Sequence, residues 1–175
     1  MSAQVEALRR LLEREAAQLV RRLTGFTEAR YAAAAPPFGS RAEVVRHLAG
    51  LLAEAGQGVE QAGSDDQPAW RALPDLPALS LADAVAVTAH DLVTALELPG
   101  PAVWTPAGRR SPAEVCAGML AEVVLHRRDI DGSRPGSETA GAVLEVLAPA
   151  SPRSPAAVLA VAAERCPAYR PWRSG

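Results

Sequence analysis

The 175-residue sequence contains no lysine and no asparagine, and Ile130 is its only isoleucine. Its basic side chains, apart from three histidines, are therefore all arginine, and alanine is abundant. This avoidance of residues with AT-rich codons is typical of a high-GC bacterial genome. The 18 basic and 20 acidic residues leave a net charge of -2, so neither a nucleic acid nor an anionic membrane surface is expected as a partner.

Cysteine is also scarce. Cys116 and Cys166 form neither a CxxC pair nor a disulfide framework, so both are expected to be reduced thiols. Cys116 falls in an apolar helical stretch, where a buried, inert thiol is favoured over a nucleophile. No apolar run approaches the roughly 20 residues that span a bilayer, and the N-terminus lacks the basic-then-apolar layout of a signal peptide. We therefore expect a cytoplasmic location without membrane association.

Apolar residues recur at helical spacing along most of the chain, and no stretch shows the sustained alternation of a strand. Their stripes predict helices over residues 5–23, 41–62, 81–98, 112–130, 138–147 and 155–165. Linkers rich in proline and glycine separate these helices. The prediction is an all-α fold, an up-and-down-type four-helix bundle with short additional C-terminal helices. Residues 1–150 form the bundle, and residues 151–175 add a helix and an extended tail to the same domain.

Serine marks the expected starts of three of the long helices. Ser40 with Glu43, and Ser111 with Glu114, match the capping-box spacing. Ser80 is a further N-cap candidate, and Pro112 suits the first position of the helix that Ser111 begins. These signals predict where the second, third and fourth long helices begin.

The fourth long helix carries ionisable groups on its apolar stripe. At about 100° per residue, one narrow sector contains Val115, Met119, Glu122, His126 and Asp129. A carboxylate in a core must be neutralised, hydrogen-bonded or bound to a metal. The second long helix has a similar anomaly, because His47 lies on its inward side.

Together, His47, Glu122 and His126 make a set of two imidazoles and one carboxylate that suits a divalent transition metal, with zinc as the first choice. Imidazole and carboxylate also accept nickel, iron or manganese. Without a metal, Glu122 and His126 would be a helix-stabilising pair four residues apart, and His47 a core or boundary histidine. The metal interpretation is favoured because two helices supply inward-facing groups.

The stretches around these residues resemble a known family. Residues 122–129, Glu-Val-Val-Leu-His-Arg-Arg-Asp, and residues 41–49, with His-Leu-Ala at their end, are similar to the DinB/YfiT-like superfamily. The branch with the most similarity is the mycothiol-dependent maleylpyruvate isomerase family. In that family a turn corresponding to Phe38-Gly39-Ser40 precedes the metal histidine. The resemblance covers most of residues 5–147; its specific part is His47, Glu122, His126 and Asp129, with supporting similarity at residues 104–108.

The resemblance implies a metal held by His47, Glu122 and His126, with Asp129 as a supporting or helix-end group. It implies mycothiol as a thiol cosubstrate, a small electrophilic substrate and an actinobacterial source. The expected activity is that of a metal-dependent thiol S-transferase or isomerase. Three alternatives remain open: a metal-dependent hydrolase, a repurposed biosynthetic enzyme, and a non-catalytic metal- or ligand-binding stress protein.

Further substrate-binding candidates come from other parts of the chain. Arg127 and Arg128 follow the metal histidine and could bind a carboxylate, although solvated helix-end cations are an equal alternative. Trp104 could cover the end of the bundle as a lid or pack as core. Asp91 sits at the edge of its helix stripe, where a surface contact is the common outcome. A homodimer through small-residue faces around Gly118 is left open.

Overall fold

The structure, a computed structural model, describes residues 2–166, and most of them are helical, as expected of an all-α chain. The helices are α1 (Ala3–Leu23), α2 (Glu28–Ala32), α3 (Arg41–Glu60), α4 (Leu81–Ala95), α5 (Pro112–Asp131), α6 (Ser137–Leu147) and α7 (Pro155–Arg165); the 3-10 turn is η1 (Ala78–Ser80), and the strands are β1 (Val103–Thr105) and β2 (Gly108–Arg110). The expected extended tail, residues 167–175, lies outside the described residues.

Two of the predicted helix starts are confirmed. Ser40 and Ser111 each accept a hydrogen bond from the backbone N–H three residues on, and Glu43 and Glu114 return the contact to the cap backbone. At the other end of α5, Gly132 adopts φ 76°, a left-handed conformation that ends the helix at low cost.

Ser80 does not cap α4. Its side chain makes no capping hydrogen bond, because the residue has helical dihedrals at the end of η1, which leads directly into α4. Two helices are also shorter than expected, since α3 ends at Glu60 and α4 at Ala95. Beyond these ends the chain continues as turns, although Ala62 and Leu96 remain buried there.

The linker before α5 contains a small hairpin that the sequence did not indicate. Strands β1 and β2 pair antiparallel, with Trp104 opposite Arg109. Three residues per strand are too few to show an alternating pattern. The hairpin packs on α3, where a Cβ on Gly58 would overlap the carbonyl oxygen of Trp104. Only glycine allows this close approach.

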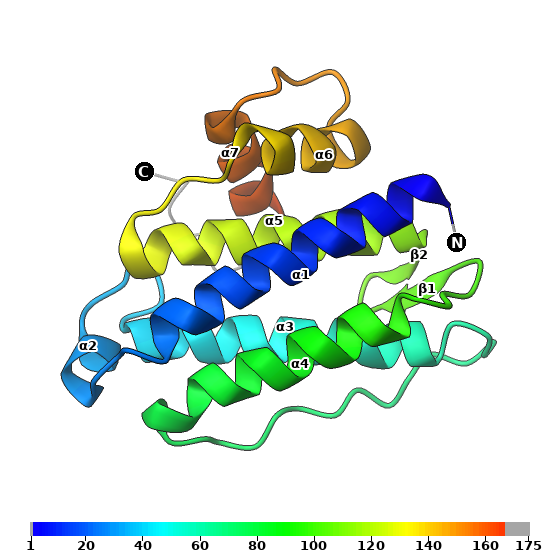
Figure 1. Cartoon of the computed structure of the whole chain (residues 1–175). Coiled ribbons are helices and arrows are strands. Elements are labelled where there is room, and N and C mark those ends of the chain that lie inside the picture. The colour runs from blue at the N-terminus through cyan, green and yellow to red at the C-terminus, as the bar shows by residue number, and fades with distance from the viewer. Residues whose placement is uncertain (1, 167–175) are drawn as a thin grey trace.

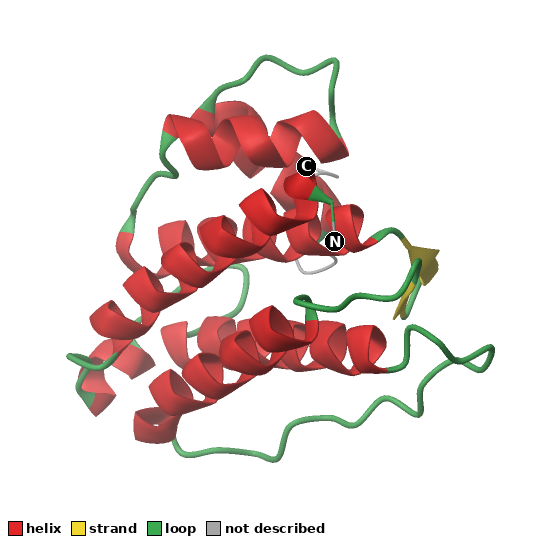
Figure 2. Cartoon of the chain, turned by 45° about the vertical axis from the view of Figure 1, so that its right-hand side comes forward, coloured by secondary structure: helices red, strands yellow, loops and turns green. Residues whose placement is uncertain are grey.

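The four long helices contact one another in a closed ring. Helix α1 packs against α4 and α5, and α3 packs against the same two helices (Figure 1). The predicted stripe of α1 is buried, and its members are Val5, Leu8, Leu12, Ala16, Leu19 and Leu23. Figure 2 shows the irregular segment of residues 61–77 running along the outside of α3 and α4. One hydrophobic core therefore extends through all four helices.

Helix α5 is more buried than the single predicted stripe implies. Its outer face is covered by α6 and α7, which lie across it above α1 in Figure 1. Val123, Val124 and Leu125, which fall on three different sides of the helix, are all fully buried. The sector of Glu122 and His126 is therefore one of several buried faces, and it points toward α3 and the end of α7.

One apolar stretch is longer than the sequence analysis expected. Within residues 2–166, the 18-residue window Ala78–Ala95 has the length and composition of a membrane span, with a mean hydropathy of 1.2. The window joins η1 to α4, and α4 itself has only 15 residues, fewer than the roughly 20 that cross a bilayer. About half of the window, 44%, is buried, and α4 packs against α1 and α3. This burial pattern is that of a core helix with one exposed face.

Candidate metal centre

Four side chains meet where α3, α5 and the end of α7 come together. They are His47, Glu122, His126 and Cys166, and each offers one ligand atom that lies within 4.8 Å of the other three. His126 is 0% exposed, Glu122 7% and Cys166 1%, while His47 is half-buried. Such a group could hold a metal ion, because it combines neutral nitrogen, carboxylate oxygen and sulfur donors in one place.

The three residues predicted as metal ligands are therefore brought together, and one was missed. Cys166 is 119 residues from His47, so no sequence spacing joins it to the site. Its only sequence signal is its position directly after the predicted end of the last helix, residues 155–165. The packing of α7 on α5 is what carries the thiol to the cluster.

Two buried polar atoms in the cluster lack hydrogen bonds among the described residues: Glu122 Oε2 and His126 Nε2. The two atoms lie 3.2 Å apart, within ion-pair distance when His126 is protonated, but they form no hydrogen bond. The other ring nitrogen, His126 Nδ1, contacts Asp129 Oδ2 at 3.2 Å. A carboxylate at Nδ1 directs the lone pair of Nε2 into the cluster. A cation bound there would coordinate both atoms, which are buried without a hydrogen bond.

The aromatic ring of Phe38 packs against both histidines. The Phe38 ring centroid is 5.0 Å from that of His47 and 5.2 Å from that of His126. The two imidazoles are nearly perpendicular, at 87° with centroids 5.3 Å apart. Gly39, with φ 88°, makes the turn that brings Phe38 against the start of α3. Phe38 thus shields the cluster from water on this side and strengthens its electrostatic interactions.

The surroundings of the cluster shift the pKa values of the two histidines in opposite directions. Burial alone would lower the pKa of His126, but contacts with Asp129, Cys166 and Glu122 outweigh it and raise the pKa to about 10. Burial, followed by repulsion from His126, lowers the pKa of His47. Without a cation, the cluster therefore concentrates positive charge at His126, where the carboxylates favour a proton. A bound metal ion would take the place of that proton.

A cavity of about 260 Å³ adjoins the cluster and reaches Glu122. The remaining lining residues come from α3, the hairpin, α5 and the end of α7: Leu51, Glu54, Ala55, Trp104, Thr105, Pro106, Ala107, Arg110, Glu114, Val115, Gly118, Met119 and Arg165. Trp104, predicted as a lid or core residue, forms part of this wall and donates its indole N–H to Ser64 O at 3.0 Å. A small molecule in the cavity would therefore lie beside one of the predicted metal ligands.

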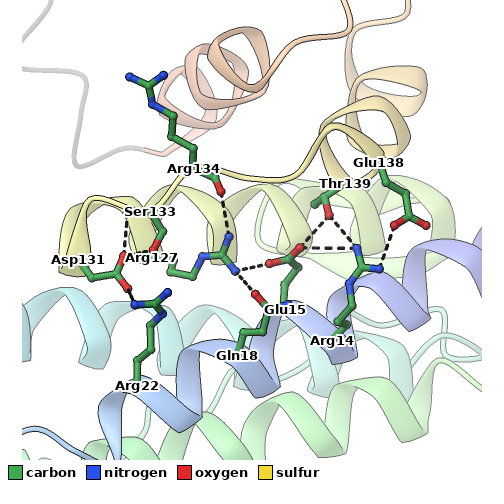
Figure 3. Close-up of polar contacts among 10 residues, drawn as sticks. All are labelled: Arg14, Glu15, Gln18, Arg22, Arg127, Asp131, Ser133, Arg134, Glu138 and Thr139. Carbon is green, nitrogen blue, oxygen red and sulfur yellow. Dashed lines mark hydrogen bonds and ion pairs between the residues drawn. The ribbon is translucent and has the colours of Figure 1, made fainter.

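Arg127 lies outside the site. Its guanidinium forms a buried ion pair with Glu15 of α1 and donates to Gln18 Oε1 at 2.9 Å and Arg134 O at 3.3 Å (Figure 3). Glu15 also accepts a hydrogen bond of 2.8 Å from Thr139. Neither the predicted carboxylate-binding role nor the alternative of a solvated helix-end cation fits this position, because α1 and the segment before α6 cover this side of α5. The Arg127 side chain therefore links α5 to α1 through Glu15 and Gln18.

The remaining predicted residues occupy different places. Asp129 contacts His126, as the resemblance implied, and its Oδ1 accepts a hydrogen bond of 2.9 Å from Arg128. Arg128 therefore supports Asp129 at the edge of the cluster. Asp91 is exposed on α4, which contributes no residue to the cluster. Gly118 lines the cavity, and a Cβ there would come within 3.7 Å of Arg165.

Comparisons with known proteins add no relative. No family model, curated protein or solved structure matches the chain significantly.

Proposed function

We propose that the chain is a metal-dependent enzyme in which His47, Glu122 and His126 hold a divalent transition metal, with zinc as the first choice. The observation that carries this proposal is that two buried atoms without a hydrogen bond, Glu122 Oε2 and His126 Nε2, converge beside a second imidazole. Two neutral imidazoles and one carboxylate leave a bound ion with net positive charge, which lowers the pKa of a coordinated thiol or water.

We further propose that the chain is a DinB/YfiT-like up-and-down four-helix bundle related to the mycothiol-dependent maleylpyruvate isomerases. The closed ring of contacts among α1, α3, α4 and α5 supports the bundle. The Phe38-Gly39-Ser40 turn lies against His47, and Asp129 contacts His126, as the resemblance implies. The proposed substrates are a small electrophile and a low-molecular-weight thiol such as mycothiol, in the cytoplasm of an actinobacterium.

Residues around the cluster have separate tasks in this proposal. Asp129 holds the His126 ring through Nδ1, so that Nε2 would face a bound ion, and Arg128 orients Asp129. Phe38 excludes water on one side. Trp104 and Met119 give the cavity apolar walls that would bind the body of an electrophilic substrate next to Glu122.

The first experiment is a zinc titration of purified protein by calorimetry, followed by mycothiol titration of the loaded form. We expect one equivalent of zinc for the native chain and loss of tight binding for His126→Ala. His90→Ala is the matched control, because His90 is an exposed histidine of α4. Absence of zinc binding by the native chain would overturn the proposal. Substrate turnover without thiol would reassign the site as a hydrolase.

A further inference from the structure

We propose that Cys166 is a fourth protein ligand of the same ion, so that the metal clasps α7 onto α3 and α5. This inference rests on the proposed metal centre and extends it to a residue that the sequence did not indicate. It changes the character of the site, because four protein ligands give a closed coordination shell, whereas three leave a position for an exogenous group.

The position of the thiol supports direct ligation. Cys166 Sγ is 3.7 Å from His47 Nε2 and lies within 4.8 Å of the donor atoms of Glu122 and His126. In a tetrahedral zinc site, bond lengths near 2.0–2.3 Å separate the ligand atoms by about 3.3–3.6 Å. The cluster therefore needs only a small contraction around an ion, and no helix has to move past another.

Cys166 differs from the other free thiol in what surrounds it. Cys116 is enclosed by apolar core, and burial raises its pKa to about 12. Cys166 faces two imidazoles and a carboxylate, and two of their atoms, Glu122 Oε2 and His126 Nε2, are buried without a hydrogen bond. A buried thiol among metal-binding groups can serve as a metal ligand, whereas a thiol in an apolar core has no metal within reach.

The chain delivers Cys166 to this position through α7. Ser154 caps the helix, Val158 and Ala162 are buried, and the Cys166 N–H donates to Ala162 O at 3.0 Å. The backbone carrying the thiol is thus part of a helix end rather than a loose loop. Coordination would release the thiol proton to solvent and leave a sulfur–metal bond in its place.

This arrangement makes Cys166 an internal competitor of any external thiol. For a small thiol to reach the ion, either Cys166 must leave or the ion must accept a fifth ligand. Arg165, the neighbouring residue, lines the cavity. Release of Cys166 would therefore shift the cavity wall beside the metal, so that thiol binding and cavity shape are coupled.

The test is cobalt substitution of the reduced protein in buffer free of small thiols. Thiolate ligation produces a near-ultraviolet sulfur-to-cobalt charge-transfer band, which nitrogen and oxygen ligands do not give. We expect this band in the native chain and in Cys116→Ser, and its loss in Cys166→Ser while the visible cobalt bands remain. Cys116→Ser is the matched control, since it removes the other buried thiol.

Each outcome separates the two proposals. Cobalt bound to the native chain without the charge-transfer band would overturn the role of Cys166 and leave the three-ligand centre standing. A band that persists in Cys166→Ser would also overturn it. No cobalt binding by the native chain would overturn both proposals. A native spectrum without the band decides against Cys166 whatever the variants do, and visible cobalt bands retained by Cys166→Ser show that this variant still folds around the ion.

Discussion

The contact between Asp129 and His126 shows how one residue can set the chemistry of another. The 3.2 Å contact at Nδ1 leaves Nε2 as the atom that faces Glu122, His47 and Cys166. An imidazole held in this way needs no reorientation when a metal arrives. A carboxylate beside a buried histidine also favours a proton when no metal is present, so proton and metal compete for the same ring.

Replacement of Asp129 by asparagine should weaken zinc binding about 10- to 100-fold, the usual cost of losing the carboxylate behind a ligating histidine. A competition titration against a zinc chelator measures the change. Asp91→Asn is the control, because Asp91 is exposed on α4 and away from the cluster. Equal zinc affinities for both variants would show that Asp129 does not position His126.

Zinc affinity should rise with pH. The pKa of His126, raised from 6.5 to about 10 in the metal-free cluster, means that zinc must displace its proton at neutral pH. Release of the His126 proton alone gives about a tenfold gain in affinity per pH unit, and release of the Cys166 thiol proton would make the slope steeper. Titrations at several pH values between about 6 and 8 test this slope, and a flat profile would contradict it.

The raised pKa of His126 has the opposite effect on the stability of the metal-free protein, which should fall as the pH rises. Because the folded pKa lies above the unfolded value, its stabilising contribution is fully present below pH 6.5 and is lost as the pH rises toward about 10. Urea unfolding with a chelator present should therefore show stability declining across this window. Since zinc requires the deprotonated ring, added zinc should restore stability at the alkaline end.

At the scale of elements, helix ends are determined by neighbouring residues in the sequence, whereas contacts between helices are determined by tertiary packing. The Ser40 and Ser111 capping boxes lie in a few consecutive residues and could be predicted from them. The hairpin could not, since its three-residue strands gain stability from packing on α3. The full burial of α5 was also invisible, because it depends on where α6 and α7 come to rest.

The contact between α1 and α5 should depend on the buried pair of Arg127 and Glu15. Both side chains are almost fully buried, so Arg127→Ala would take the buried cation from Glu15, leaving it Thr139 and the more distant Arg14, and cost up to about 3–5 kcal/mol. Urea denaturation measures the loss. Arg153→Ala is the control, because the pair of Arg153 with Glu145 is exposed and should change stability little. Equal effects of the two substitutions would contradict a structural role for Arg127.

The close packing of the hairpin on α3 can be tested with a second pair of matched substitutions. Gly58→Ala would press a methyl group against the Trp104 carbonyl and should destabilise the fold by about 1–3 kcal/mol. Gly50→Ala, in the same helix but with open space at its Cβ, should stabilise it by about 0.5–1 kcal/mol. Thermal unfolding distinguishes the two signs. A neutral Gly58→Ala variant would show that the hairpin can move away from α3 without cost.

At the scale of the whole molecule, the proposed ion joins segments that the chain keeps far apart. His47 lies on α3, Glu122 and His126 on α5, and Cys166 at the end of α7. A ligand that binds only the folded state stabilises it by mass action. Metal bound at this junction would therefore stabilise the contacts among three helices at once.

Removal of zinc by a chelator should lower the melting temperature of the native chain. At a free zinc concentration about 100 times the dissociation constant, the stabilisation is about 2.7 kcal/mol. The melting temperature of Cys166→Ser should rise less at the same zinc concentration, and that of Cys116→Ser should rise as much as that of the native chain. An identical melting curve with and without zinc would contradict metal binding to the folded state.

The sequence by itself determined the helical class, the main capping sites and the anomaly of Glu122 and His126 on an inward face. Those features depend on residues within a few turns of one another, where helical periodicity applies. Tertiary structure alone decided that Arg127 pairs with Glu15, that Trp104 lines the cavity, and that Cys166 joins the histidines. These contacts join residues that are distant along the chain, so they depend on how the hairpin, α1, α3 and α7 pack around α5 and on one another.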